Sequence, residues 1–265
     1  MLSPYLLAPP AVFQLAPPYD RFAAVPDTDA LAWGAPVSGE PDAGVPPPAL
    51  ADGAVLVVGL ASPDDWDAAA ALVPRLQARF PAAPVVVRVP GASAPAELGR
   101  RAAALHVRAV LGEDESPADR LRWRLTDDAG LEDEVAWWLT LRDPALPPAV
   151  VGLARDIVRL APRYHEVAPL LAELGHAERT VRTWCGRAGM PGPGKWLAAA
   201  HAVRAALRLQ TGRAPLLALA VEAGYSDHSS LSRQYVRLFG VRPGAIRRTL
   251  GWEWLLDRWL RRATG

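Results

Sequence analysis

Short polar and arginine side chains recur at helical spacing in two stretches of the C-terminal half, on stripes separate from the apolar residues. The first polar stripe consists of Arg179, Arg182 and Thr183. The second consists of Ser229, Arg233 and Arg237, with His228 and Ser230 in the first turn of the same predicted helix. An arginine can form two parallel hydrogen bonds with a guanine, and hydroxyl groups can bond to base edges or phosphate oxygens. Side chains of these types are suited to binding a ligand through hydrogen bonds and charge, and not to catalysing a reaction. The chemistry that they indicate is therefore recognition.

Each polar stripe falls in a unit made of a helix, a glycine-containing turn and a second helix. The predicted units are Glu166–Leu174, Gly175 and Ala177–Arg187, and then Pro215–Ala223, Gly224 and Asp227–Phe239. Glycine tolerates the left-handed turn between two helices, and Ala220, four residues before Gly224, allows them a close approach. Asp227 is predicted to cap the helix that follows it. Both units therefore have the pattern of a helix-turn-helix.

Apolar residues at helical spacing predict which side of each second helix is buried. The predicted buried residues are Val181, Trp184 and Cys185 in the first unit, and Leu231, Tyr235 and Leu238 in the second. A long helix, Lys195–Gln210, is expected to join the units. A rigid connector of this kind could hold two recognition helices about 34 Å apart, which is one turn of B-DNA.

Residues 165–248 resemble the DNA-binding domain of AraC/XylS-type transcriptional regulators, which has seven helices and two helix-turn-helix motifs. The most specific segment is Ala220–Arg248, AVEAGYSDHSSLSRQYVRLFGVRPGAIRR, in which Pro243 suits the first turn of the last helix. The resemblance implies double-stranded DNA as the partner. It implies groove-facing positions at Arg179, Arg182 and Thr183 in the first unit and at His228, Ser229, Ser230 and Arg233 in the second.

The first unit departs from the family pattern at two places. Leu171 stands where the family usually has alanine, and His201, in the connecting helix, stands at a common arginine position. We therefore expect the first helix-turn-helix to contact the DNA backbone more than the bases, or to bind weakly.

The net charge of +1 conceals two halves of opposite sign. Residues 1–148 hold 11 basic and 20 acidic residues, a balance of −9, and residues 149–265 hold 18 and 8, a balance of +10. Such asymmetry indicates an anionic partner for the basic half. It also suggests the hypothesis that the acidic half competes with DNA, so that residues 149–265 alone bind non-specific DNA more tightly than the full chain.

The N-terminal half alternates predicted strands and helices, which is typical of a parallel sheet. The predicted strands are Ala54–Leu60, Pro84–Val89 and Arg108–Leu111, with weaker candidates at Arg21–Val25 and Ala30–Trp33, and the predicted helices are Trp66–Phe80 and Pro95–His106. The order of elements resembles a response-regulator receiver, a flavodoxin-like α/β fold. The fold class is therefore an α/β domain followed by an all-α domain.

The receiver-like half lacks the residues of phosphoryl transfer. The position of the phosphoacceptor aspartate falls at or near Gly59, and the one lysine of the chain, Lys195, lies in the other half. Transfer to an aspartate needs a carboxylate nucleophile, acidic ligands for Mg²⁺ and a lysine. We expect either a degenerate receiver or a generic α/β domain that binds a small ligand or partner. Both imply regulation or dimerisation without phosphorylation.

Other candidate catalytic and metal-binding motifs lack residues that their chemistry requires. The segment from Gly189 to Lys195, GMPGPGK, approaches a P-loop, but Trp196 replaces the hydroxyl residue that would bind Mg²⁺. The five histidines lack metal-ligand spacing, and Cys185, the single cysteine, is expected to be a small buried residue. No cofactor, no metal and no enzymatic activity are expected. One cysteine and the absence of a transmembrane segment or signal peptide favour a cytoplasmic protein.

The proline cluster DPALPP marks the predicted domain boundary. The predicted domains are 1–145, the receiver-like regulatory domain, 146–251, the DNA-binding domain, and 252–265, an amphipathic helix. Packing of this last helix, WEWLLDRWLRR, on its own chain is the first expectation, followed by dimer contact and then a membrane surface.

The function predicted is a sequence-specific transcriptional regulator, with a homodimer through the N-terminal domain and an unidentified effector as further expectations. The alternative is an α/β small-ligand sensor or enzyme whose helical half serves assembly.

Overall fold

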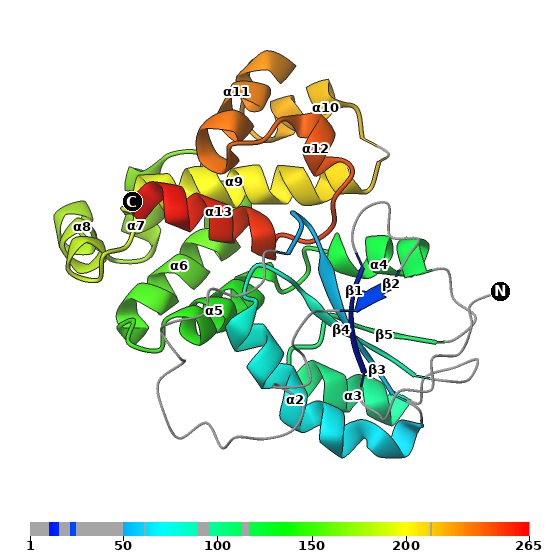
Figure 1. Ribbon diagram of the computed structural model, residues 1–265. Helices are drawn as coiled ribbons and strands as arrows, with labels where there is room; N and C mark the ends of the chain where they lie inside the picture. The colour runs from blue at the N-terminus through cyan, green and yellow to red at the C-terminus, as the bar shows by residue number, and fades with distance from the viewer. Residues whose placement is uncertain are drawn as a thin grey trace. The chain divides into compact units, whose positions relative to one another are not determined.

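The chain forms two compact units, which divide between Leu125 and Thr126 (Figure 1). The computed structural model describes residues 11–15, 22–24, 50–60, 62–89, 96–112, 117–212 and 214–264. The first unit, Met1–Leu125, is called the N-terminal unit below, and the second, Thr126–Gly265, the helical unit.

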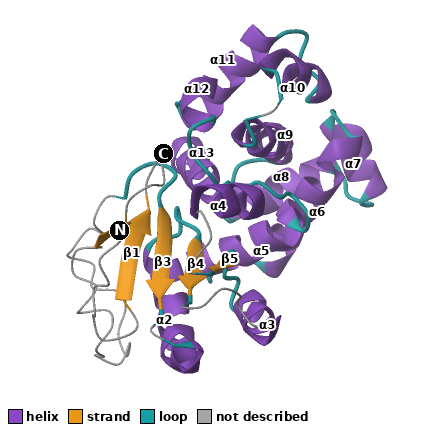
Figure 2. Ribbon diagram, turned by 90° about the vertical axis from the view of Figure 1, so that its right-hand side faces the viewer, coloured by secondary structure: helices purple, strands orange, loops and turns teal. Residues whose placement is uncertain are grey.

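A five-stranded sheet in the order β2-β1-β3-β4-β5 organises the N-terminal unit. The strands are β1 (Ala11–Leu15), β2 (Phe22–Ala24), β3 (Val55–Gly59), β4 (Val85–Arg88) and β5 (Ala109–Leu111). The last three run parallel, with Val57 opposite Val86, whereas β1 runs antiparallel to both of its neighbours (Figure 2).

The β-branched runs form strands because both of their faces are buried, as in a parallel sheet. Leu56 and Val85 share a core with α2 (Trp66–Arg79) and α3 (Ala96–Ala104), while Val57 on the opposite face is also buried. The 3-10 turn η1 (Pro63–Asp65) leads into α2, and α4 (Pro117–Leu125) packs on β5.

The predicted parallel strands and helices of this unit are confirmed, but the receiver topology is not. The strand β2 lies within the candidate Arg21–Val25, and the candidate Ala30–Trp33 lies outside the described residues. A receiver sheet has parallel strands throughout, whereas β1 here is antiparallel to β3. The unit shares with a receiver the three parallel strands β3, β4 and β5 and the helices between them.

The helical unit is built around one long helix, α9 (Pro193–Gln210), against which helices from both ends of the unit pack. The other elements are α5 (Leu131–Arg142), α6 (Pro148–Leu160), η2 (Ala161–Arg163), α7 (Val167–Glu173), α8 (Glu178–Arg187), α10 (Leu216–Glu222), α11 (His228–Phe239), α12 (Pro243–Ile246) and α13 (Glu253–Thr264). Alanine and leucine dominate the buried side of α9, including Ala199, Ala202 and Leu207, so neighbouring helices can approach closely.

The boundary between the units lies earlier than the DPALPP cluster, where the sequence placed it. Pro144 and Pro147 of that cluster lie in the short loop between α5 and α6, Pro148 begins α6, and the two helices pack against each other. Val135, Trp138 and Leu139 of α5 are buried, as are Val150 and Leu153 of α6. Two proline-linked helices with complementary apolar faces form a helical hairpin, so the cluster marks a turn inside a unit.

The C-terminal helix packs on its own chain and belongs to the helical unit instead of forming a separate segment at 252–265. The ring of Trp259 meets Trp196 of α9 edge to face, with 4.6 Å between centroids, and Trp252 meets Trp138 of α5 at 5.8 Å. Glu253 and Asp257 of this helix are buried although both are acidic. Asp257 is only 1% exposed and pairs with Arg142 of α5 and Arg261. Ion pairing explains why an acidic residue can turn inward.

Among the residues that the structure describes, every helix is too short or too polar to cross a membrane.

Replacing the buried carboxylate of Asp257 should destabilise the helical unit. We expect Asp257→Ala to lower the free energy of unfolding by about 2–4 kcal/mol, because Arg142 then keeps a partly buried charge without its partner. Arg261→Ala is the matched control, since that side chain is 64% exposed and its loss should cost less than about 1 kcal/mol. Urea unfolding measures both, and equal losses would show that Asp257 does not anchor α13.

Candidate nucleic-acid interface

The first helix-turn-helix motif consists of α7, a turn at Gly175, and α8. Gly175 has φ +68°, and the N–H of His176 donates to the carbonyl of Leu171 at 2.9 Å, which closes the end of α7. Leu171, Val181 and Cys185 are buried, and Trp184 is half-buried. Leu171 is thus accommodated on the buried side of the motif. Burial raises the pKa of the Cys185 thiol, as expected of a structural cysteine.

The second helix-turn-helix motif, α10 and α11, repeats this arrangement. Gly224 has φ +80°, and the N–H of Tyr225 donates to the carbonyl of Ala220 at 2.8 Å. Leu231, Tyr235 and Leu238 are buried, as their spacing predicts. In each motif the apolar stripe of the second helix therefore fixes which side chains face outward.

The two motifs differ at the N-terminus of the second helix. Asp227 caps α11 and accepts a hydrogen bond from the N–H of Ser230 at 2.8 Å. This bond, together with the Ser226 hydroxyl, holds the pKa of the Asp227 carboxyl below its usual value. The corresponding residue before α8 is Ala177, which offers no side-chain cap. The helix α11 is consequently better anchored at its N-terminal end than α8.

The predicted polar residues of α8, Arg179, Arg182 and Thr183, are all exposed, and with Glu178 they line a shallow hollow. Glu178 pairs with Arg182 at 2.7 Å, and the Thr183 hydroxyl donates to the carbonyl of Arg179 at 2.9 Å. The polar stripe predicted from the sequence omits Glu178, although the i, i+4 spacing of Glu178 and Arg182 is the signal of such a pair.

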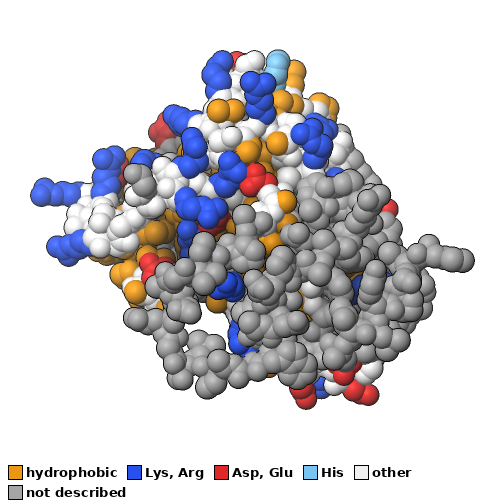
Figure 3. Space-filling view, in the orientation of Figure 1, with side chains coloured by type: hydrophobic (Ala, Val, Ile, Leu, Met, Phe, Trp, Pro, Cys, Tyr) orange, Lys and Arg blue, Asp and Glu red, His pale blue; other side chains and the backbone are white. Residues whose placement is uncertain are grey.

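On α11, the side chains of His228, Ser229, Arg233 and Arg237 are exposed, and that of Ser230 is half-buried. Arg233 donates to the Ser230 hydroxyl at 2.9 Å, and that hydroxyl bonds to Asp227 at 3.1 Å. Ser230 thus serves the cap and the orientation of Arg233. On the face drawn in Figure 3, Lys and Arg side chains gather over the regions of α8 and α11.

A polar stripe on α9, made of His201, Arg204 and Arg208, contacts the elements around it. The Nε2–H of His201 donates to the carbonyl of Tyr164 at 2.9 Å. Arg208 pairs with Glu222 at the end of α10. Spacings of three and four residues put these side chains on one helix face.

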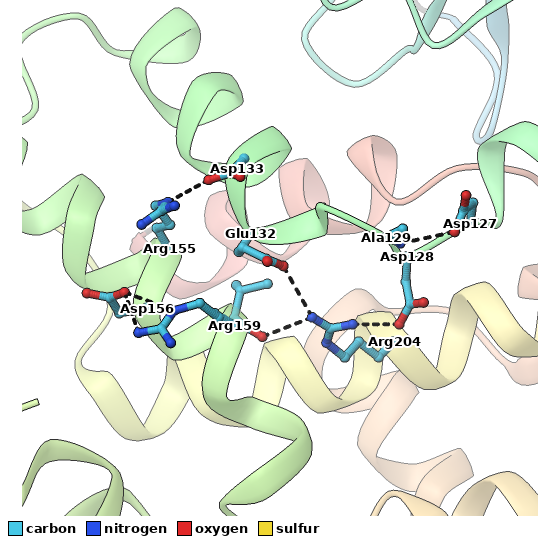
Figure 4. A network of polar contacts seen from close by, with 10 residues as sticks. Asp127, Asp128, Ala129, Glu132, Asp133, Arg155, Asp156, Arg159 and Arg204 are labelled. Carbon is cyan, nitrogen blue, oxygen red and sulfur yellow. Dashed lines mark hydrogen bonds and ion pairs between the residues drawn. The ribbon is translucent and has the colours of Figure 1, made fainter. Parts of the chain in front are cut away.

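Arg204 is the centre of a polar network (Figure 4). Its guanidinium lies 2.5 Å from a carboxylate oxygen of Asp128 and 3.6 Å from one of Glu132, and it donates to the carbonyl of Val158 at 3.2 Å. Asp133 pairs with Arg155 of α6 at 2.6 Å. These carboxylates stabilise the joint between α5, α6 and α9.

The acidic residues around α5 change the charge balance of the two units. They fall in the helical unit, which therefore holds 19 basic and 14 acidic residues, a balance of +5, against −4 for the N-terminal unit. The charge contrast is smaller than the division at residue 148 suggests. A fragment 149–265 would also lack the whole of α5, so a fragment that begins at Thr126 is the appropriate one for testing the competition hypothesis.

Within the described residues, no group of three or more histidine, cysteine or acidic side chains is arranged to hold a metal ion.

The region that holds the two motifs is similar in sequence to known proteins. Residues 170–249 match the family model of a helix-turn-helix domain, a match that begins within α7 and covers the rest of both motifs. A putative AraC-like transcription regulator of Streptomyces antibioticus is 31% identical over 118 residues, which cover 44% of this chain and 37% of that protein. The match therefore spans about a third of the relative's length.

The transcriptional regulator CdpR of Pseudomonas aeruginosa is a structural match over 75% of this chain and 69% of its own, with 17% identity. The TM-score of 0.35 is too low for that likeness to support an argument about fold.

The cap at Asp227 should contribute measurably to the free energy of unfolding. We expect Asp227→Ala to lower the free energy of unfolding by about 1 kcal/mol, and Asp227→Asn to change it by only a few tenths because asparagine also caps. Ala177→Ser should stabilise α8 by about 0.5–1 kcal/mol by adding the missing cap. Chemical denaturation tests all three, and an unaffected Asp227→Ala protein would contradict the capping role.

His201 should make stability depend on pH. Burial, and secondarily the nearby His165 and Arg204, lower its pKa, although the hydrogen bond to Tyr164 opposes this effect. The unfolded chain then binds a proton more readily than the folded one, so stability should fall as pH drops below about 6.5, the ordinary histidine value. His201→Gln, which keeps a hydrogen-bond donor, should flatten the curve between pH 7 and 5.5. Parallel curves for the two proteins would show that His201 does not contribute.

Proposed function

We propose that this chain is a sequence-specific DNA-binding transcriptional regulator, in which α8 and α11 enter the major groove of double-stranded DNA. The observation that carries the proposal is the repeated helix-turn-helix geometry at residues 170–249. Each motif buries an apolar stripe and exposes arginines on its second helix. This construction suits recognition helices, because the buried stripe fixes their orientation. Its action is binding rather than catalysis.

The second motif is the stronger candidate for reading bases. Arg233 lies in the second turn of α11, and its bond to Ser230, which the Asp227 cap anchors, holds its guanidinium towards the N-terminal end of the helix. Recognition helices direct this end into the groove. His228, Ser229 and Arg237 extend the same surface. A pre-positioned arginine loses less side-chain freedom when it pairs with a guanine.

The first motif contributes through Arg179, Arg182 and Thr183, with more contact to the DNA backbone than to bases. Arg182 must leave Glu178 or share it when it meets DNA. An exposed pair of this kind is worth no more than about 1 kcal/mol, so the exchange is feasible but reduces the net gain. Glu178 also places a negative charge beside this surface.

The N-terminal unit serves regulation or dimerisation without phosphorylation. The strand β3 ends at Gly59, and Asp65, which follows it, accepts a hydrogen bond from the N–H of Ser62 at 2.8 Å. That carboxylate caps the turn before α2, where an acidic residue suits the helix dipole. The chain supplies no lysine to this unit. These features favour a partner- or ligand-responsive unit over a phosphoacceptor.

A binding titration with a selected DNA site tests the proposal. Arg233→Ala should weaken specific binding by about 1–3 kcal/mol, the usual value of a bidentate contact with guanine. Arg159→Ala is the control, since it removes an exposed arginine from α6, outside both motifs. Affinity of the unmodified chain should also fall steeply with salt, with a slope of about −0.9 per neutralised phosphate.

Each part of this experiment can fail separately. Unchanged affinity of Arg233→Ala at fixed salt would remove that residue from the interface. Absence of salt-dependent DNA binding by the unmodified chain would contradict the proposed function and favour a ligand sensor or enzyme whose helical unit serves assembly.

A further inference from the structure

Two histidines from distant parts of the chain stack where the two helix-turn-helix motifs meet the connecting helix. His165 lies just before α7, and His201 lies midway along α9. Their rings are nearly parallel, with 5.0 Å between centroids and 16° between planes. The hydrogen bond from His201 to the carbonyl of Tyr164 fixes the backbone beside His165 onto α9.

The exposed side chain of His165 also reaches the turn of the second motif. A Cβ atom placed on Gly224 would lie 2.9 Å from Nδ1 and 3.1 Å from Cε1 of His165. The ring therefore packs against backbone at the turn between α10 and α11. Gly224 is needed here both for its positive φ and for this close approach.

The contact joins elements that are separate in the chain. His165 leads into the first motif, His201 belongs to the connector, and Gly224 is the turn of the second motif. An independent link lies nearby, since Arg208 of α9 pairs with Glu222, two residues before Gly224. The polar stripe of α9 thus contacts the entrance of the first motif and the end of the first helix of the second.

We propose that His165 is a positioning residue that couples the two helix-turn-helix motifs and thereby sets the spacing of the two half-sites that the protein prefers on DNA. The inference rests on the proposed function and deepens it. A flat ring that contacts both His201 of α9 and the turn at Gly224 restricts rotation of one motif relative to the other. Two recognition helices that are held rigidly can occupy successive grooves at one spacing only.

The coupling can be measured without DNA. Spin labels at Arg187→Cys on α8 and Val236→Cys on α11 occupy exposed positions, whereas the native Cys185 is buried. Pulsed electron resonance should give a narrow distance distribution for this pair. His165→Ala should broaden it, and His165→Phe should restore it, because a flat ring is again available for stacking. His176→Ala is the matched control, because the ring of His176 contacts that of Trp184 within the first motif, with 5.3 Å between centroids, and so does not link the two motifs.

The DNA experiment uses a panel in which the two half-sites are moved apart or together by one base pair. The unmodified chain should discriminate among spacings, and His165→Ala should reduce that discrimination by about threefold to tenfold, the size of an ordinary coupling energy. His165→Phe should recover it, and His176→Ala should leave the spacing preference unchanged even where overall affinity falls.

The outcomes separate the inference from the function. An unchanged distance distribution and spacing profile in His165→Ala would overturn the positioning role and leave the proposed function standing. Absence of DNA binding by the unmodified chain would overturn both. A His165→Ala chain that unfolds altogether would also overturn the coupling role, because the ring would then stabilise the helical unit as a whole.

Discussion

The packing of neighbouring helices against α9 is the constraint on which the helical unit depends. Its 18 residues extend about 27 Å, and its small buried side chains let α6, α10 and α11 approach. Apolar contact of this kind holds helices together without specifying their orientation closely. The polar stripe at His201, Arg204 and Arg208 adds that specification, because hydrogen bonds and ion pairs are directional.

Several acidic residues of the chain form local ion pairs within the helical unit. Asp128, Glu132 and Asp257 each meet an arginine inside the helical unit. Removing residues 1–148 as an inhibitory acidic half would therefore also remove Asp128 and Glu132, the structural partners of Arg204. The exposed arginines of α8 and α11 keep their charge at the surface, where it can meet phosphate groups.

Local pattern predicted the second motif well. The positions of Leu231 and Tyr235 follow from helical periodicity, and the cap at Asp227 follows from residue type, because both properties depend on neighbours in sequence. Sequence could not place the division of the units, since the partner of α5 is decided by long-range packing around Trp138. The direction of β1 and the stacking of His165 on His201 likewise depend on contacts between distant residues.

In the proposed function, the two helix-turn-helix motifs held by α9 read DNA together. The most direct measurement is a footprint on DNA selected from a random pool by the full chain. We predict an enriched sequence with protection in two successive major grooves, about 10 base pairs apart, and with the stronger base preference under α11. Selection that enriches no sequence, or a footprint confined to one groove, would contradict it.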